Sequence, residues 1–199
     1  MRLKLIALTS LCLVMSASFA VAKEKKHKHM DQQEMMEVYK QLGTPGEPHK
    51  QLASLEGAWT TQAKEWMEPG KPPMESTGTA DFKMLLDGHY LHQDYHGSMM
   101  GQPYNGMGVT GYDNLRKKYV STWIASMDTG IFMMEGTASP DGKTITMKGQ
   151  HAEPGGGLMT HRAVWKLVDA NTQIFEMYGA EKGKKETKML EITYTRKQG

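Results

Sequence analysis

Most of the chain after residue 57 consists of short runs in which apolar and polar residues alternate, separated by turn residues such as Asp-Gly and Pro-Gly. Alternation with a period of two is typical of strands that bury one face, and these turn residues are typical of hairpins. The ten runs lie near residues 58–67, 75–86, 90–96, 104–112, 119–127, 131–138, 144–151, 159–168, 173–178 and 185–195. This pattern predicts an all-β protein, a ten-stranded antiparallel up-and-down barrel, with a β-sandwich as the alternative.

The hairpin formed by residues 104–112 and 119–127 has the clearest pattern. If Tyr112 pairs with Tyr119, counting along antiparallel strands places these residues opposite one another: Thr110 and Ser121, Gly108 and Trp123, Gly106 and Ala125, Tyr104 and Met127. Glycine weakens a strand unless something must approach closely, so Gly106 and Gly108 predict a notch for Trp123 or for a ligand on it. The other face carries Met107, Val109, Val120 and Ile124. Two apolar faces fit a curved sheet closed over a cavity.

The first 22 residues have the features of a signal peptide. Arg2 and Lys4 precede an apolar run at residues 5–14, which is followed by small residues and by an Ala-Val-Ala sequence at 20–22. We expect cleavage after Ala22, with Ala20 as the second choice, and export to the periplasm or the medium. The run is shorter than the roughly 20 apolar residues of a spanning helix, and no later segment approaches that length. The only cysteine, Cys12, would be lost on cleavage.

The segment between the signal peptide and the first strand is predicted to be partly helical. Residues 23–30, KEKKHKHM, are interpreted as a charged linker, with a metal-binding histidine tract as the alternative. Asp31 and Glu34 have capping-box spacing, and apolar residues recur at helical spacing until Gly43. We expect this helix to cover the barrel as a lid or plug, or else to bind a partner. Residues 49–55 form a further helical turn, so residues 31–56 make a helical segment before a barrel domain at 57–197.

Charge and length exclude some classes of function. The chain has 199 residues, which is one domain of ordinary size, with 24 basic and 22 acidic residues. Loss of Arg2 and Lys4 would leave 22 of each, so the mature protein has no net basic surface for nucleic acid.

Several short motifs resemble those of a known bacterial family. They are Met67-Glu68-Pro69-Gly70, Pro72-Pro73-Met74-Glu75, Gly101-Gln102-Pro103, Gly111-Tyr112-Asp113-Asn114, Tyr119-Val120-Ser121-Thr122-Trp123, Glu176-Met177-Tyr178 and Glu191-Ile192-Thr193-Tyr194-Thr195-Arg196. In this order they resemble the domain-of-unknown-function family 1579 (DUF1579), over residues 49–197. The resemblance implies a calycin-like (lipocalin-like) barrel and no mechanism. One departure is His89, where the family more often has arginine.

Histidines provide the candidate metal and haem ligands. His92, Asp94 and His96 share one face of a predicted strand, and imidazole with carboxylate suits zinc or iron. Positions i and i+4 on a strand are about 13 Å apart, however, so at most neighbouring pairs can share an ion, and a polar outer face is the alternative. His161 lies on an apolar face, where it is a core residue or the axial ligand of a haem.

Other residues are candidates for ligand binding rather than catalysis. The Asp-Thr-Gly sequence at 128–130 occurs once, whereas aspartic proteases need two such carboxylates, and no serine or cysteine nucleophile motif is present. Tyr194 and Arg196 share a face and resemble the carboxylate clamp of fatty-acid-binding barrels; an ion pair of Arg162 or Arg196 with Glu176 is the alternative. The predicted ligand-binding residues are Trp123, Tyr104, Tyr112, Gly108, Tyr119, Met127, Arg162, Tyr178, Tyr194 and Arg196.

Together these features favour a secreted or periplasmic binding protein that holds a small apolar or amphipathic molecule without catalysis. The 18 methionines suit this interpretation, because their unbranched side chains adapt to a ligand of variable shape; a copper-handling surface is the alternative. A haem or metal protein, an enzyme acting on a small hydrophobic substrate, and an interaction domain are the other classes considered.

The signal peptide generates the first testable prediction. N-terminal sequencing of the protein recovered from its native host should begin at Lys23, or at Val21 if the second site is used. Recovery of an intact chain beginning at Met1 in the cytoplasm would contradict export.

Overall fold

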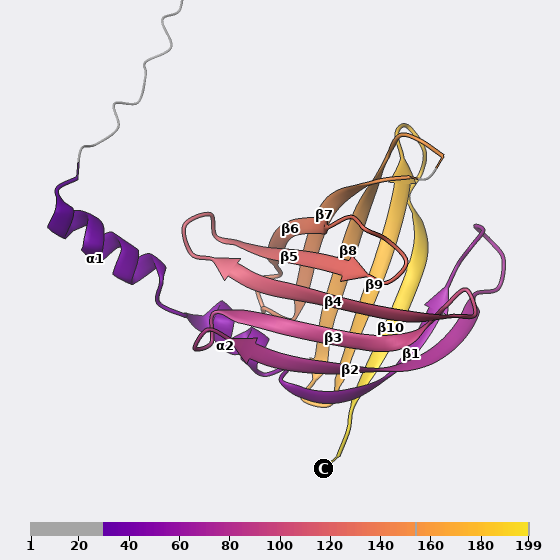
Figure 1. Cartoon of the computed structure of the whole chain (residues 1–199), viewed down its shortest axis with the longest axis horizontal. Helices are drawn as coiled ribbons and strands as arrows, with labels where there is room; N and C mark the ends of the chain where they lie inside the picture. The colour runs from indigo at the N-terminus through magenta and orange to yellow at the C-terminus, as the bar shows by residue number, and fades with distance from the viewer. Residues whose placement is uncertain (1–29, 154, 199) are drawn as a thin grey trace, which may run out of the picture.

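The computed structural model describes residues 30–153 and 155–198 and contains two helices followed by ten strands (Figure 1). The predicted signal peptide and residues 23–29 of the predicted linker lie outside the described residues. The elements are α1 (Gln32–Leu42), α2 (Glu47–Ala53), β1 (Gly57–Glu65), β2 (Met74–Leu85), β3 (Tyr90–Met99), β4 (Gln102–Asp113), β5 (Lys118–Ala125), β6 (Phe132–Ala138), β7 (Thr144–Ala152), β8 (Leu158–Asp169), β9 (Thr172–Glu181) and β10 (Thr187–Arg196). The predicted strands are confirmed, each to within about three residues at its ends.

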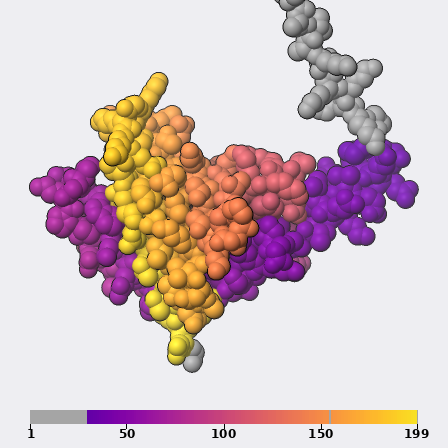
Figure 2. Space-filling model, turned by 180° about the vertical axis from the view of Figure 1, so that it is seen from behind, coloured from indigo at the N-terminus to yellow at the C-terminus, as the bar shows by residue number. Residues whose placement is uncertain are grey.

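The strands form one closed antiparallel barrel. Each strand pairs with its neighbours in sequence, and β1 pairs with β10 from Trp59 opposite Arg196 to Glu65 opposite Leu190. Figure 2 shows the wall made by the C-terminal strands from behind. Closure confirms the up-and-down barrel and excludes the sandwich, because a sandwich would leave two separate sheets with free edges.

The hairpin of β4 and β5 has the predicted register over most of its length. Tyr112 pairs with Tyr119, and the pairing continues to Gly106 opposite Ala125. The predicted pair of Tyr104 and Met127 is wrong, because β5 ends at Ala125 and the chain turns there.

The outer face of this hairpin is not buried. Met107 and Ile124 are 44% and 42% exposed. The apolar residues on this second face are therefore not a second buried face: Met107 and Ile124 are exposed, and Val109 and Val120 are half-buried.

Helix α2 closes one end of the barrel. Leu52 and Leu55 are buried there, and the indole Nε1 of Trp59 donates a hydrogen bond to the Leu55 carbonyl (3.0 Å). Tyr119 Oη donates to Gln51 Oε1 (2.7 Å), which ties α2 to β5. The short helical turn predicted at 49–55 is confirmed and is the plug of this end.

Helix α1 does not cover the barrel, so the lid or plug predicted for it is wrong. None of its residues is buried, and it extends away from the barrel in Figures 1 and 2. Its predicted capping box is present, with the Asp31 carboxylate accepting from the Glu34 amide (2.8 Å). Leu52 of α2 and Leu55, which follows the helix, belong instead to the buried core at this end.

The C-terminal end of α1 is held by two turns of the barrel. The Asn114 amide donates to the carbonyls of Leu42 (2.8 Å) and Thr44 (3.0 Å), and His89 Nε2 donates to the Gly43 carbonyl (2.6 Å). His89, the departure from the family pattern, therefore anchors the segment between α1 and α2.

Among the described residues, no helix is long and apolar enough to cross a membrane.

Arg196 connects the end of β10 to the start of β1 and to the segment before it, at the closed end of the barrel. Its guanidinium lies 4.2 Å from the centroid of the Trp59 ring and donates to the carbonyls of Ala170 (2.8 Å), Ser54 (2.7 Å) and Glu56. The planar guanidinium of arginine can donate to three carbonyls while its face lies on an aromatic ring. The ammonium group of lysine has no such planar face.

Replacement of this arginine tests its structural importance. Arg196→Lys should lower the free energy of unfolding by about 1–3 kcal/mol, because carbonyls lose charged donors. Urea denaturation followed by circular dichroism measures the change. Arg116→Lys is the matched control: Arg116 pairs with Glu135 on the surface, where such a change costs about 0.5 kcal/mol or less. Equal effects of the two substitutions would contradict the special importance of Arg196.

Candidate ligand-binding site

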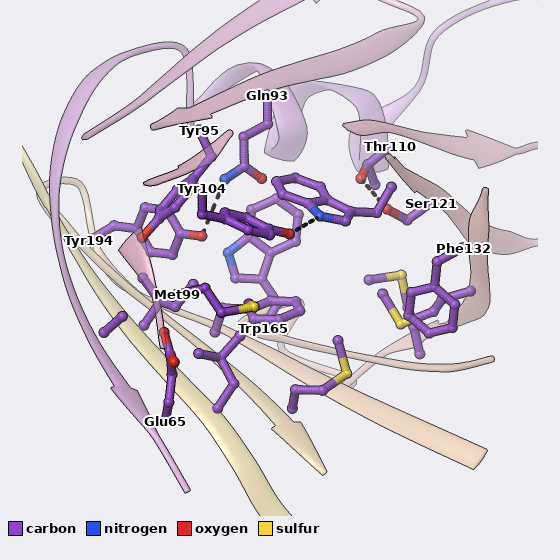
Figure 3. Close-up of a pocket in the computed structure, with 18 of the residues that line it drawn as sticks. Glu65, Gln93, Tyr95, Met99, Tyr104, Thr110, Ser121, Phe132, Trp165 and Tyr194 are labelled. Atoms are coloured by element: carbon purple, nitrogen blue, oxygen red, sulfur yellow. Dashed lines mark hydrogen bonds between the residues drawn. The ribbon is translucent and has the colours of Figure 1, made fainter. Parts of the chain in front are cut away.

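The barrel interior divides into a filled half and a hollow half. Near α2, the ring centroid of Phe82 lies about 6 Å from those of Trp59, Trp165 and Tyr194. Beyond them lies a cavity of about 220 Å³. Its lining residues, most of which are drawn in Figure 3, are Ala63, Glu65, Gln93, Tyr95, Ser98, Met99, Tyr104, Thr110, Ser121, Trp123, Phe132, Met134, Met147, Trp165, Phe175, Met177, Leu190, Ile192 and Tyr194.

Trp123 forms one wall of the cavity and lies across two glycines, as the hairpin pattern predicts. A Cβ atom built on Gly106 would be 2.3 Å from Trp123 Cζ2, and one built on Gly108 would be 2.7 Å from Trp123 Cε3. A larger residue at Gly106 would push against the indole, and one at Gly108 would meet both the indole and the Thr122 carbonyl oxygen. The indole Nε1 donates to Tyr104 Oη (2.8 Å), which fixes the ring orientation.

The polar groups of the cavity are mostly neutral and hydrogen-bonded to one another. Gln93 Nε2 donates to Tyr194 Oη (3.2 Å), and the hydroxyls of Thr110 and Ser121 are 2.9 Å apart (Figure 3). Burial raises the pKa of the Tyr104 and Tyr194 phenols above their usual value. The hydrogen bonds of Tyr104 with Trp123 and of Tyr194 with Gln93 lower these pKa values, but by less. Both phenols are therefore neutral at physiological pH.

Glu65 is the exception to this neutrality. Among the described residues that line the cavity, it alone carries a formal charge. It is 7% exposed, and its Oε2 accepts from the Met100 amide (3.1 Å). An anionic ligand would therefore meet a carboxylate and no cation.

The predicted carboxylate clamp of Tyr194 and Arg196 is wrong. Tyr194 lines the cavity, whereas Arg196 lies at the closed end and donates to backbone carbonyls. The two side chains share the inner face, but the distance along the strand takes Arg196 out of the hollow half.

Arg162 and Tyr178 are also misplaced by the sequence prediction. They face each other on the outer surface of β8 and β9, with the guanidinium 4.1 Å from the Tyr178 ring centroid. Arg162 forms an ion pair with Glu186 (2.6 Å). Glu176, the alternative partner considered for the arginines, instead pairs with Lys166 and Lys188 (2.8 Å each).

Tyr112, Tyr119 and Met127 do not line the cavity. The rings of Tyr112 and Tyr119 contact each other (centroids 5.0 Å apart) below α2, where burial raises the pKa of Tyr119 to about 12. Met127 is 48% exposed in a turn.

Of the predicted ligand residues, the structure thus brings Trp123, Tyr104 and Tyr194 together at the cavity, with Gly108 behind the indole. Their part in binding stays a prediction.

Some lining residues were missed by the sequence analysis although alternation points to them. Gln93 and Tyr95 occupy the face of β3 opposite to the histidines, and that face points inward. The histidines drew attention to the outer face. Glu65 lies at the end of β1, and the sequence has no feature that marks it.

The metal candidates on β3 lie on the outer surface and do not converge on one ion. His92 Nδ1 is 3.5 Å from Asp94 Oδ2, while His96 Nδ1 hydrogen-bonds with Asn105 Oδ1 (2.8 Å). His161 points inward, as predicted, but is not among the described residues that line the cavity. The geometry therefore gives the haem prediction no support.

Comparison with solved structures identifies proteins with a similar fold. Rv2717c from M. tuberculosis superposes with a TM-score of 0.55 at 14% identity, covering 78% of this chain and 100% of that one. The S-type phycobiliprotein lyase CPES from Guillardia theta superposes with a TM-score of 0.54 at 10% identity, covering 75% and 92%. Both similarities show the fold alone. No match is found among curated proteins.

The family resemblance suggested by the motifs is confirmed by a family model described as "Protein of unknown function (DUF1579)". The match covers residues 44–196, which include α2 and all ten strands. The chain belongs to the DUF1579 family.

Proposed function

We propose that this protein, after export, is a non-catalytic binding protein that holds a small, mainly apolar molecule without negative charge inside the barrel. The observation that carries the proposal is the cavity of about 220 Å³, which is lined by aromatic and methionine side chains, neutral polar groups and one carboxylate. The barrel fold shared with the phycobiliprotein lyase supports the proposal in general terms.

Apolar contact supplies the affinity in this proposal. Trp123, Phe132 and the cavity methionines offer a surface that gains about 25 cal/mol for each Å² of apolar area removed from water. The volume corresponds to about seven water molecules, which is below the range of about 300–1,000 Å³ for drug-sized ligands. The ligand is therefore a short chain or a single ring.

The neutral polar groups and Glu65 supply selectivity. A ligand hydroxyl or amine can share hydrogen bonds with Gln93, Tyr194 or the Thr110 and Ser121 pair. A ligand carboxylate would be desolvated beside Glu65 without a cation to compensate, which is costly. This excludes the fatty-acid-binding arrangement that the Tyr-x-Arg sequence resembles.

Native mass spectrometry of protein purified from its native host tests the proposal directly. A retained small molecule that is released on unfolding is the expected result. Absence of a retained molecule, together with no binding across a panel of short alcohols, amines and aromatic compounds, would contradict it.

The glycine notch generates a further prediction. Trp123→Ala should weaken binding of octan-1-ol by about 1–3 kcal/mol, since one buried aromatic contact is lost. Gly106→Ala should weaken it comparably, because the three atoms nearest to the new methyl group all belong to Trp123 and the methyl group would drive the ring into the cavity. Gly108→Val is less informative, since its Cβ would also meet the Thr122 carbonyl (2.6 Å).

Isothermal titration calorimetry is the suitable measurement, because Trp59, Trp66 and Trp165 also fluoresce. Ile124→Ala is the control: Ile124 follows Trp123 on the same strand but faces outward. If the Trp123 and Gly106 variants bind octan-1-ol as the parent does, Trp123 is not part of the binding site.

The charge of the cavity generates another prediction. At neutral pH, octan-1-ol and octylamine should bind at least about tenfold more tightly than octanoate, because Glu65 opposes a second carboxylate. Glu65→Gln should reduce this preference while leaving the affinity for octan-1-ol within about threefold. Tightest binding of octanoate by the parent protein would contradict the selectivity proposed here.

A further inference from the structure

Three potential metal ligands converge at the mouth of the barrel, on strands β7 and β8. His151 and Glu153 are two positions apart and therefore project to the same side, and Glu153 lies just past the end of β7. His161 on β8 is opposite Gly149, two residues from His151, so it is a diagonal neighbour of His151 on the inner face. One ligand atom from each residue lies within 4.8 Å of the others.

Asp128 holds His151 in an orientation suited to metal binding. Its Oδ2 is 2.9 Å from His151 Nε2, and its Oδ1 accepts from the amides of Thr129 (2.6 Å) and Gly130 (3.0 Å). Nε2 of His151 therefore donates its proton to a fixed carboxylate, which leaves the Nδ1 lone pair free, with Nδ1 3.8 Å from Glu153 Oε1. Metal-binding histidines commonly donate their second ring N–H to a carboxylate in this way.

His161 contributes an independent observation. Its Nδ1 is buried and has no hydrogen-bond partner within the part of the chain that the structure describes. The ring lies against Phe132 (centroids 5.2 Å apart) and near His151 (6.3 Å). Buried polar atoms nearly always have a partner. A bound metal ion would provide that partner for the Nδ1 lone pair of His161.

We propose that His151, Glu153 and His161 bind a divalent transition metal ion of the zinc class, with Asp128 as the positioning residue for His151. Two imidazoles and one carboxylate are a common donor set for Zn²⁺, with a fourth position left for water. Tetrahedral ligands about 2.1 Å from zinc are separated by roughly 3.4 Å, so the three ligand atoms must approach by about 1.4 Å at most. Glu153 lies just past the end of β7, so its side chain can supply part of this movement, and rotation of the imidazole rings would supply the rest.

The proposed metal site is adjacent to the ligand cavity but does not depend on the function proposed for it. Phe132 lines the cavity and also contacts the rings of both histidines, 5.9 Å from His151 and 5.2 Å from His161. The ion would lie behind this ring, at the open end.

Zinc titration of the purified, EDTA-treated protein by calorimetry tests the proposal. His27 and His29 are replaced by glutamine in every sample, because the N-terminal histidine tract can bind zinc by itself. We expect one Zn²⁺ per chain, and loss of at least about 100-fold in affinity in His151→Gln and in His161→Gln, each of which removes one ligand. Asp128→Asn should weaken binding by about 10–100-fold, as expected for a partner of a ligand.

The outer histidines of β3 provide the matched control. His92→Gln/His96→Gln removes two histidines that do not converge with a third ligand, and it should leave zinc affinity unchanged. Circular dichroism reports whether each variant folds. If His161→Gln does not fold, His151→Gln is the decisive variant, because the His151 side chain is 36% exposed and its replacement disturbs the core less. Absence of zinc binding in the parent, or equal affinity in the folded His151→Gln variant, would overturn the proposal.

Discussion

Closure of the sheet between its first and last strands is the constraint on which the rest of the structure depends. The hydrogen bonds between β1 and β10 remove both edges of the sheet, so every strand is hydrogen-bonded to a neighbouring strand on each side. Closure also divides each alternating strand into an inner and an outer face. Arg196 strengthens the junction, because it bridges the end of β10, the Trp59 ring at the start of the sheet and the segment after α2.

A closed barrel has two ends, and in this protein only one of them is filled by side chains and a helix. One end is filled by α2 and by the aromatic cluster around Phe82. The other end has no such plug among the described residues, and the cavity lies in that half. Packing and binding are thus separated along the barrel axis, so the cavity can remain hollow while the filled end carries much of the stability.

The distribution of charge follows from the low polarity of the interior. Ion pairs such as Arg162 with Glu186 and Lys188 with Glu176 lie on the outer face of the barrel wall. The Glu176 carboxylate is buried there, and the ammonium groups of Lys166 and Lys188 compensate its charge. The interior phenols are held neutral by burial. Glu65 and the imidazoles at the mouth are therefore the inner groups best suited to recognise a polar ligand or an ion.

The sequence by itself determined the number and order of the strands, the family, and the register of β4 with β5, including the two glycines beneath Trp123. These features rest on local alternation, turn residues and counting from Tyr112 opposite Tyr119, and all of these can be read along the chain. The position of a side chain along the barrel axis is not local information. Only the tertiary structure decided that Arg196 lies at the closed end and Tyr194 at the cavity, that α2 rather than α1 is the plug, and that Asp128, Glu153 and the inward histidines meet. Those residues come from separate strands and turns, and only the closure and curvature of the sheet bring them together.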